Sequence, residues 1–198
     1  MEMLLPELTA RQAEYVANPA AYKLFGGAMG GGKSYALCLH AILLMLDFPG
    51  NQGLICRQDM ADLSPTTYKE FVQICQNFLG GIPGPVVKQH HQTENWIEFA
   101  NGSRVYFRGL KDVGSLGSWN LGFFCIDEAA ETTIDQFNML DSRLRLALPG
   151  LRRFGLLASN PDLGWVFNDF IAKPLPEHAF VPALPRDNPH LPADYEAR

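Results

Sequence analysis

The sequence lacks the features that would send a protein to a membrane or across it. Its longest apolar stretch, residues 36–46, is interrupted by His40 and is shorter than the roughly 20 residues of a membrane-spanning helix. The first residues, MEMLLP, include no basic residue and no long apolar segment, so they do not fit a secretory signal peptide. We therefore expect no membrane partner.

Cysteine and charge are also scarce. The four cysteines form no C-x-x-C pair, and three of them lie in apolar runs, so we expect reduced core residues of a cytoplasmic protein. Charged residues make up 19% of the chain and the net charge is −5, which excludes a basic surface over the whole domain. Any contact with nucleic acid must come from a local patch.

One segment offers such a patch. Four of the 16 basic residues lie close together in the sequence: Arg143, Arg145, Arg152 and Arg153. We expect this segment to face the phosphates of a nucleic acid, with a contact between subunits as the alternative.

The remaining composition, 198 residues of which 47% are hydrophobic, predicts one domain with its own core. Periodicity predicts helices over 9–18, 33–46 and 65–79, the last with Ser64 as a possible N-cap, and strands over 22–26, 53–57, 121–126 and 154–158. The segments 96–100 and 103–108 flank Asn101-Gly102, which predicts a β-hairpin with a type I′ turn.

Alternating strands and helices are typical of an α/β domain with a mainly parallel sheet. The chain turns polar and proline-rich after Pro174. We therefore assign residues 1–182 to the domain and residues 183–198 to a linker or extended arm.

The strongest motif is the segment from Gly27 to Ser34, which fits G-x-x-x-x-G-K-[ST] between a predicted strand and a long apolar helix. Glycines let the backbone N–H groups point at phosphate oxygens, and the helix N-terminus adds partial positive charge. We expect Lys33 to reach the β- and γ-phosphates and Ser34 to bind Mg²⁺. The residues assigned to nucleotide binding here are Gly27, Ala28, Met29, Gly30, Gly31, Gly32, Lys33 and Ser34.

A second motif places two acids, Asp127 and Glu128, just after an apolar run. The carboxyl ends of strands are where α/β sheets bind ligands. We expect Asp127 to hold Mg²⁺ together with Ser34, and Glu128 to orient and deprotonate the attacking water. The second acid favours hydrolysis of ATP over transfer of phosphate to a small acceptor.

Two weaker signals complete the candidate site. Ser159 or Asn160, at the end of another predicted strand, is expected to touch the γ-phosphate or the water, although a plain Asn-Pro turn is the alternative. The amide of Gln12 matches the two-bond edge of adenine. Thr9 and Gln12 also match a T-x-x-Q capping box, so both interpretations of Gln12 stay open.

These segments together resemble the ATPase domain of the large terminase subunit, the DNA-packaging motor of tailed bacteriophages. The segments that carry the resemblance are 8–12, 26–34, 126–129, 158–161 and the closing 187–192. The resemblance implies a three-layer α/β/α P-loop NTPase with a mainly parallel sheet, Walker A and Walker B motifs, a catalytic glutamate and, in this chain, an inserted β-hairpin.

The resemblance also implies roles and partners. Lys33 and Ser34 would belong to the phosphate loop, Asp127 would be the magnesium acid, Glu128 the catalytic base, Gln12 the adenine reader, and Ser159-Asn160 the coupling motif. ATP and Mg²⁺ would be bound. Copies of the protein would form a ring on a portal protein in the host cell cytoplasm, work with a small terminase subunit, and pull double-stranded DNA into a capsid.

Two departures from the family pattern matter. Met29 lies where many relatives have an arginine that stabilises transition-state charge, so another arginine or a neighbouring subunit must supply it. Our candidate is Arg143, and the alternatives are Arg57, Arg104, Arg108 and Arg145. The chain also has no room for the C-terminal nuclease domain of such proteins, so we expect an ATPase domain without nuclease activity.

Other classes remain as alternatives from the residues alone. A helicase-like or repair ATPase would use the same motifs, but a helicase would need a second motor lobe. A small-molecule or nucleotide kinase would have less use for Glu128. A nucleotide-gated switch could dispense with that base altogether.

Overall fold

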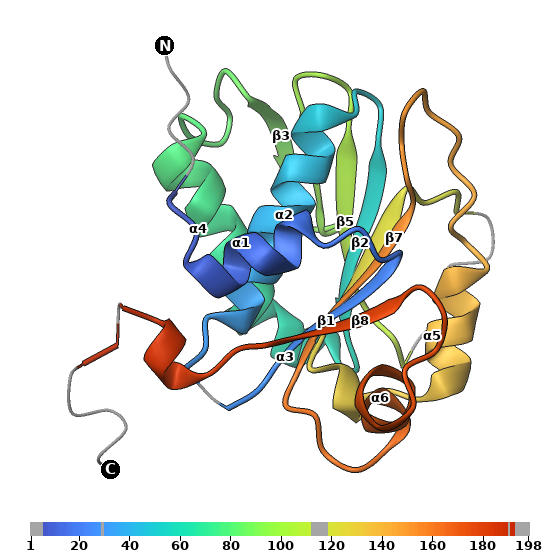
Figure 1. Ribbon diagram of the computed structural model, residues 1–198. Coiled ribbons are helices and arrows are strands. Elements are labelled where there is room, and N and C mark those ends of the chain that lie inside the picture. The colour runs from blue at the N-terminus through green and yellow to red at the C-terminus, as the bar shows by residue number, and fades with distance from the viewer. Residues whose placement is uncertain (1–5, 29, 112–118, 190, 193–198) are drawn as a thin grey trace.

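The computed structural model describes residues 6–28, 30–111, 119–189 and 191–192, and one twisted sheet runs through them (Figure 1). Its strands are β1 (Tyr22–Gly26), β2 (Gln52–Arg57), β3 (Val87–His91), β4 (Trp96–Phe99), β5 (Arg104–Gly109), β6 (Phe123–Asp127), β7 (Phe154–Ser159) and β8 (His178–Pro182). The spatial order is β3-β4-β5-β2-β6-β7-β1-β8. The strands from β5 to β8 in this order are parallel, and β4 is antiparallel to both of its neighbours, β3 and β5.

Helices cover both faces of the sheet, which gives three layers (Figure 1). On one face lie α1 (Ala10–Ala17), α2 (Lys33–Asp47), α3 (Met60–Leu63) and α4 (Lys69–Phe78), and on the other α5 (Ile134–Asp141) and α6 (Trp165–Phe167). Neighbouring residues of a strand enter opposite cores: Phe25 packs with α2 and Leu24 with α5 and α6. The expected three-layer α/β/α class is confirmed.

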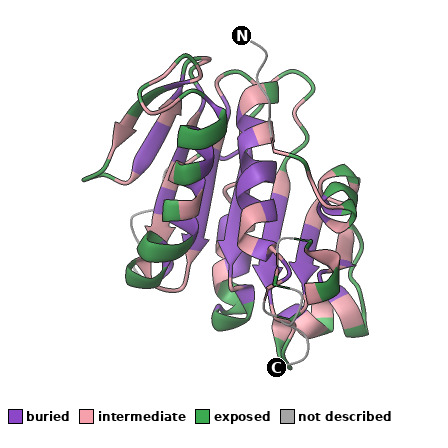
Figure 2. Ribbon diagram, turned by 90° about the vertical axis from the view of Figure 1, so that its left-hand side faces the viewer, coloured by how far each residue is buried: buried purple, intermediate pink, exposed green. Residues whose placement is uncertain are grey.

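The helix α2 is apolar almost all round because it lies between the sheet and the outer helices. Ten of its residues are buried, and Figure 2 shows burial concentrated in the central strands and the helix against them. Among the described residues, no helix is both long and apolar enough to cross a membrane.

The predicted hairpin forms, but its turn differs from the prediction. A type I′ turn needs positive φ at both central residues, and only Gly102 has it, at 83°. The amide of Asn101 instead donates to the Met45 carbonyl at 2.8 Å. The hairpin is thereby anchored to the end of α2, and it extends the parallel sheet at one edge.

Other boundaries also differ. The helical run predicted over 65–79 begins earlier, with α3, passes through a π-helical turn η1 (Ser64–Tyr68) and continues as α4, so Ser64 is internal and caps nothing. The sequence pattern did not predict the helix α5 or the edge strand β8. The strand β8 nevertheless pairs in parallel with β1 along its whole length.

The segment assigned to a linker begins inside the domain. Ala183 is fully buried, and its N–H donates to the Gly26 carbonyl at 2.7 Å. A short 3₁₀ turn, η5 (Pro185–Asp187), follows. The described part of this segment therefore packs against the end of β1, and the division into a domain and a linker stays a prediction.

The packing of β2 on β6 gives a test of the core. A Cβ added at Gly53 would lie 2.1 Å from the Cζ atom of Phe123, which is fully buried and cannot swing into solvent. We expect Gly53→Ala to lower the free energy of unfolding by about 1–3 kcal/mol, measured by equilibrium urea unfolding. Gly164→Ala is the matched control because no described atom lies within 4 Å of its added Cβ. Equal losses in both variants would contradict this account.

Candidate functional site

The sheet order places the chemical residues at one edge. The strands β6, β7 and β1 are neighbours and run parallel, so their carboxyl ends meet. The segment 27–32 follows β1, Asp127 ends β6, and Ser159 ends β7. Motifs spread over more than 130 positions of the sequence therefore form one cluster.

Lys33 lies at the start of α2 with its ammonium group held by oxygens. Its Nζ donates to the carbonyls of Gly27 and Ala28, at 3.1 and 2.9 Å, and to Oδ1 of Asn160 at 2.8 Å. Burial lowers the pKa of Lys33, and the charges of Glu128 and Asp127 oppose that shift. A hollow of about 250 Å³ lies against the loop and is lined by Lys33 and Glu128, among others. Met29 of the same motif lies outside the described residues.

Asp127 is buried and accepts hydrogen bonds from two hydroxyl groups. The Oγ of Ser34 lies 3.1 and 3.0 Å from its two carboxylate oxygens, and Thr67 of η1 donates to Oδ2. Hydroxyl and carboxylate oxygens are the donors that Mg²⁺ prefers, so the Ser34–Asp127 pair fits that ion. Among the described residues, no group of three or more His, Cys, Asp or Glu side chains could hold a metal ion. Thr67 was not found from the sequence, since a threonine inside a helical run has no distinguishing pattern.

Glu128 follows Asp127 in a left-handed conformation, with φ 48° and ψ 54°. A non-glycine residue rarely adopts this conformation, which costs about 1–2 kcal/mol. The strained backbone turns the side chain into the same hollow as Lys33. Burial raises the pKa of Glu128, and the charge of Asp127 adds to it, while Lys33 and Arg57 oppose the shift. A carboxylate of raised basicity next to a phosphate-binding loop is suited to accept a proton.

The two residues after β7 differ in position. Asn160 contacts Lys33 directly, as described above. Ser159 is fully buried, and its Oγ accepts the N–H of Ala130 at 3.0 Å, while its carbonyl accepts the N–H of Gly27 at 3.3 Å. Ser159 therefore ties the turn after Glu128 to the phosphate loop. The contact of Ser159 or Asn160 with the γ-phosphate or the water stays a prediction.

Of the two interpretations of Gln12 that the sequence left open, the structure shows the capping box. The capping box of α1 is formed, with the Thr9 N–H donating to Oε1 of Gln12 at 3.0 Å. The Nε2 of Gln12 donates to the Gly32 carbonyl at 3.3 Å and so reaches the phosphate loop. A second hollow, of about 370 Å³, is lined by Gln12, Gly32 and Asn188, among others. The role of Gln12 toward a base stays a prediction.

Glu70 is a site residue that the sequence did not reveal. It lies on α4 and lines both hollows, as does Tyr35. No hydrogen bond or ion pair joins Glu70 to another described residue. Burial, reinforced by the charge of Asp127, raises the pKa of Glu70 to about 7. A glutamate on an amphipathic helix normally lies in solvent, so only the packing of α4 on α2 identifies it.

The candidate arginines lie at different places. Arg143 follows α5, and its carbonyl accepts the N–H of Leu121, at the opposite end of β6 from Asp127. A five-residue strand spans about 16 Å, so Arg143 does not reach the site of its own chain. Arg57, at the carboxyl end of β2, is the one candidate whose charge acts on the pKa of Glu128. It forms two hydrogen bonds with Glu131, at 2.9 and 2.7 Å.

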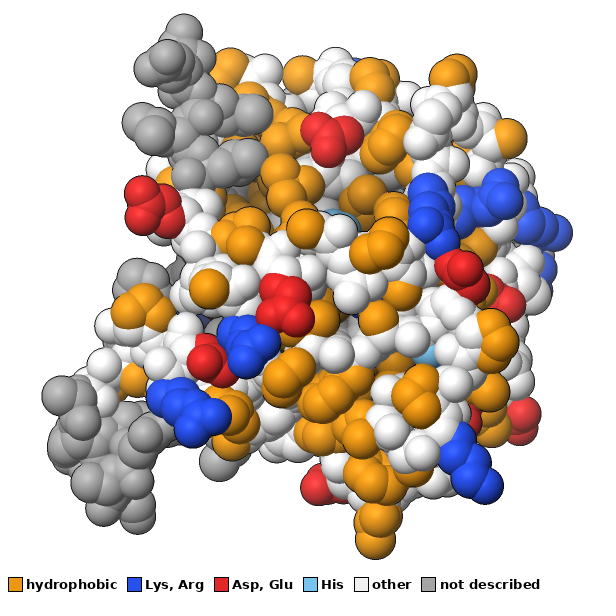
Figure 3. All heavy atoms as spheres, in the orientation of Figure 1, with side chains coloured by type: hydrophobic (Ala, Val, Ile, Leu, Met, Phe, Trp, Pro, Cys, Tyr) orange, Lys and Arg blue, Asp and Glu red, His pale blue; other side chains and the backbone are white. Residues whose placement is uncertain are grey.

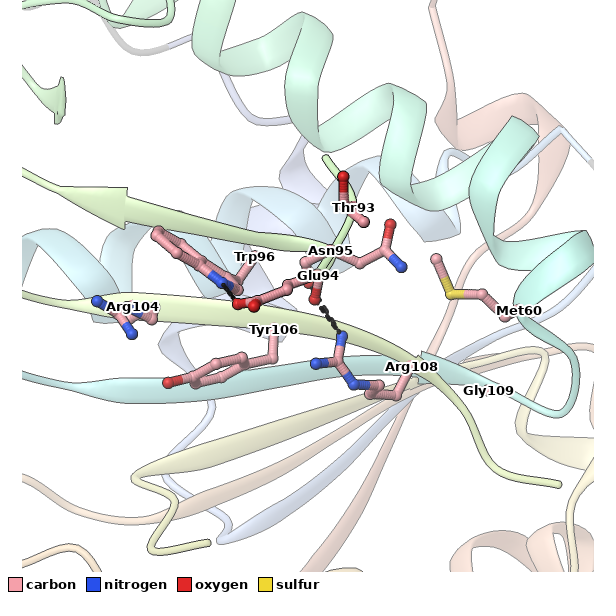
Figure 4. A pocket seen from close by; sticks show the side chains of 9 residues that line it. All are labelled: Met60, Thr93, Glu94, Asn95, Trp96, Arg104, Tyr106, Arg108 and Gly109. Atoms are coloured by element: carbon pink, nitrogen blue, oxygen red, sulfur yellow. Dashed lines mark hydrogen bonds between the residues drawn. The ribbon is translucent and has the colours of Figure 1, made fainter. Parts of the chain in front are cut away.

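Arg104 and Arg108 lie in a separate hollow of about 350 Å³ on the hairpin (Figure 4). The guanidinium of Arg104 stacks on the ring of Trp96, 4.2 Å from its centroid, and pairs with Glu98. Arg108 donates to backbone carbonyls, including that of Glu94 at 2.7 Å. Neither arginine lines the hollows beside the phosphate loop.

The segment with four arginines leads into the start of β7. It therefore lies at the amino ends of the parallel strands, and the phosphate loop lies at their carboxyl ends. Figure 3 shows basic side chains gathered on this side of the molecule, with acidic side chains next to them. Arg152 pairs with Glu177, whereas Arg145 and Arg153 are exposed and donate to backbone carbonyls. A contact of this segment with nucleic acid stays a prediction.

Comparisons with known proteins identify a family for the chain and agree with its fold. A sequence model of the phage terminase large subunit family matches residues 20–196. The PBSX phage terminase large subunit of Bacillus subtilis (strain 168) is 26% identical over 172 residues, which cover 85% of this chain and 38% of that protein. The chain thus spans well under half the length of this curated relative.

Solved structures show the same fold. The large terminase from a thermophilic bacteriophage, in complex with ADP, superposes with a TM-score of 0.75 at 16% identity, over 96% of this chain and 49% of that one. The large terminase ATPase domain of Thermus phage P74-26 gives 0.70 at 17% identity, over 91% of this chain and 82% of that one.

The raised pKa of Glu70 predicts a pH-dependent effect on stability. The folded-state pKa of about 7 lies above the ordinary value of 4.5, so ionising Glu70 costs folding free energy as the pH rises from 4.5 through 7. We expect Glu70→Gln to raise the melting temperature relative to the wild type more at pH 8 than at pH 5. Gln73→Ala, an exposed change on the same helix, should give the same difference at both pH values. A Glu70→Gln difference that is independent of pH would contradict the assignment.

Proposed function

The chain belongs to the phage terminase large subunit family, and we propose that this domain hydrolyses ATP to drive the movement of double-stranded viral DNA into a capsid. The observation that carries the proposal is the single cluster of Lys33, Asp127 and Glu128 at the carboxyl edge of the sheet. The ADP bound by the large terminase of the thermophilic bacteriophage supports a nucleotide in the matching cleft.

In the proposed mechanism, Lys33 binds the β- and γ-phosphates, and the N–H groups of the phosphate loop surround the remaining oxygens. Ser34 and Asp127 would hold Mg²⁺, and Thr67 donates a hydrogen bond that keeps the Asp127 carboxylate in place. When bound, Mg²⁺ neutralises charge on the phosphates. Asn160, which contacts the Lys33 ammonium, is placed to sense whether the γ-phosphate is present.

Glu128 acts on the attacking water. Its raised basicity and its position in the phosphate hollow suit it to orient the water and to accept a proton from it. Arg57 and Lys33 stabilise the ionised form of Glu128, which is the form that acts as a base. Ser159, next to Asn160, accepts the N–H of Ala130, two residues after Glu128, so the strand ends that carry Asn160 and Glu128 are linked.

The wider assembly belongs to the same proposal. Arg143 lies too far from the site of its own chain, so it completes a site only if it is supplied to another copy, as in a ring. The exposed Arg145 and Arg153 are proposed to face DNA phosphates. A portal protein and a small terminase subunit are the expected partners, in the host cell cytoplasm.

Glu128→Gln is the central test. We expect the variant to bind ATP with Mg²⁺ as the wild type does and to lose phosphate release by about 10²–10⁴-fold, because the amide cannot accept the proton. Lys33→Ala is expected to lose both binding and hydrolysis. Phosphate release is measured against protein concentration, with and without double-stranded DNA.

Three outcomes are informative. A specific rate that rises with protein concentration or with DNA supports a motor subunit completed by its neighbour. A rate independent of both means that the chain supplies its own arginine, with Arg57 as the first residue to replace. Normal hydrolysis by Glu128→Gln would refute the assignment of the base.

Gln12→Ala separates the two roles of that residue. If the amide reads adenine, the variant loses its preference for ATP over GTP in hydrolysis and in binding, by about tenfold or more for one bidentate contact. If Gln12 only caps α1, the variant loses about 0.5–2 kcal/mol of stability and keeps the nucleotide preference. Thr9→Ala is the matched control because it breaks the capping box and leaves the Gln12 amide in place.

A further inference from the structure

Residues 183–189, called here the closing segment, lie directly against the phosphate loop. The segment leaves β8 and turns through η5, where Asp187 lies 3.9 Å from Arg11 of α1. Its fold is fixed locally, because the N–H of Leu184 donates to Asp187 at 3.0 Å and the N–H of Asn188 donates to the Pro185 carbonyl at 2.9 Å. It is therefore a defined wall of the nucleotide site.

The phosphate loop is shaped to admit this segment. A Cβ added at Gly27 would lie 2.1 Å from the carbonyl oxygen of Ala183, and a Cβ added at Gly31 would lie 2.8 Å from the same atom. Both neighbours are backbone atoms, which cannot rotate away as a side chain would. Positions 27 and 31 must therefore be glycine for the closing segment to pack against the loop, whether or not they also contact phosphate.

Asn188 adds a hydrogen bond from the closing segment to the loop. Its Nδ2 donates to the Gly30 carbonyl at 2.7 Å. A trans peptide is planar, with its C=O and N–H pointing in opposite directions. Holding the Gly30 carbonyl therefore directs the N–H of Gly31 away from Asn188, and Gly31 lines the phosphate hollow.

We propose that Asn188 is a positioning residue of the phosphate loop, which fixes the Gly30–Gly31 peptide so that the affinity for nucleotide depends on the closing segment. The inference rests on the proposed function of the site. It predicts that the chain beyond β8 communicates with the phosphates through the Asn188–Gly30 hydrogen bond.

The test compares the wild type with Asn188→Ala and Asn188→Asp by isothermal titration calorimetry with ADP and Mg²⁺. Loss of one neutral hydrogen bond is expected to weaken ADP binding by about two- to tenfold in Asn188→Ala. Asn188→Asp keeps the shape of the side chain but, when ionised, cannot donate to the carbonyl and adds negative charge, so it should weaken binding at least as much. Asn77→Asp, at an exposed position of α4, is the matched control and should bind as the wild type does.

A positioning role also predicts how the kinetics divide. The KM for ATP should rise by the same factor as the Kd for ADP, with kcat changed by less than about twofold, because the hydrogen bond acts on binding in the ground and transition states alike. A lower kcat at unchanged KM, or wild-type affinity in both variants, would overturn the proposal. If the wild type itself binds no ADP, the proposed function fails instead.

Hydrogen exchange gives a readout that needs no variant. In the wild type, ADP should slow exchange of the amides of residues 184, 187 and 188, since a loop fixed by phosphate in turn fixes the segment that holds it. The slowing should be lost in Asn188→Ala. Exchange in the closing segment that does not respond to ADP in the wild type would overturn the coupling.

Discussion

The buried carboxylate of Asp127 is the group on which the rest of the site depends. A buried charge is costly unless it is hydrogen-bonded, and the hydroxyls of Ser34 and Thr67 provide those bonds. The two donors come from the start of α2 and from η1, so one side chain joins a strand to two helical segments. This connection holds the start of α2, and η1, which leads into α4, beside the end of β6.

A second level of order comes from short links between neighbouring strand ends. Ser159 joins β7 to the turn after Glu128 and to Gly27, and Asn160 joins β7 to Lys33. A displacement at the end of β6, β7 or β1 therefore acts on the other two through these hydrogen bonds. Under the proposed function, these hydrogen bonds provide a physical route from the nucleotide to the sheet, and the proposed role of Asn188 extends that route to the chain beyond β8.

The site also contains an acidic side chain, Glu70, to which the proposed mechanism gives no role. Glu70 and Glu128 lie in one hollow beside Asp127, and burial raises the pKa of both glutamates. Acidic groups held this close favour the binding of cations, which is consistent with a nucleotide that arrives with Mg²⁺. Among the described residues, Lys33 and Arg57 are the cations whose charges lower the pKa of Glu128 and so oppose the effect of burial.

The sequence by itself determined the phosphate loop, the acidic pair and the α/β class, because these depend on local patterns: glycine spacing, an apolar run ending in acid, and alternation of strands and helices. It also indicated the capping box of Gln12. The tertiary structure decided what depends on contacts between distant segments. Thr67 and Glu70 lie at the site only because α4 packs on α2. Arg143 lies away from the site because β6 separates it from Asp127. The segment 178–182 forms the strand β8 because it pairs with the free edge of β1. The closing segment looked like a linker because its prolines and polar residues favour no regular element, yet its backbone fits the glycines of the phosphate loop.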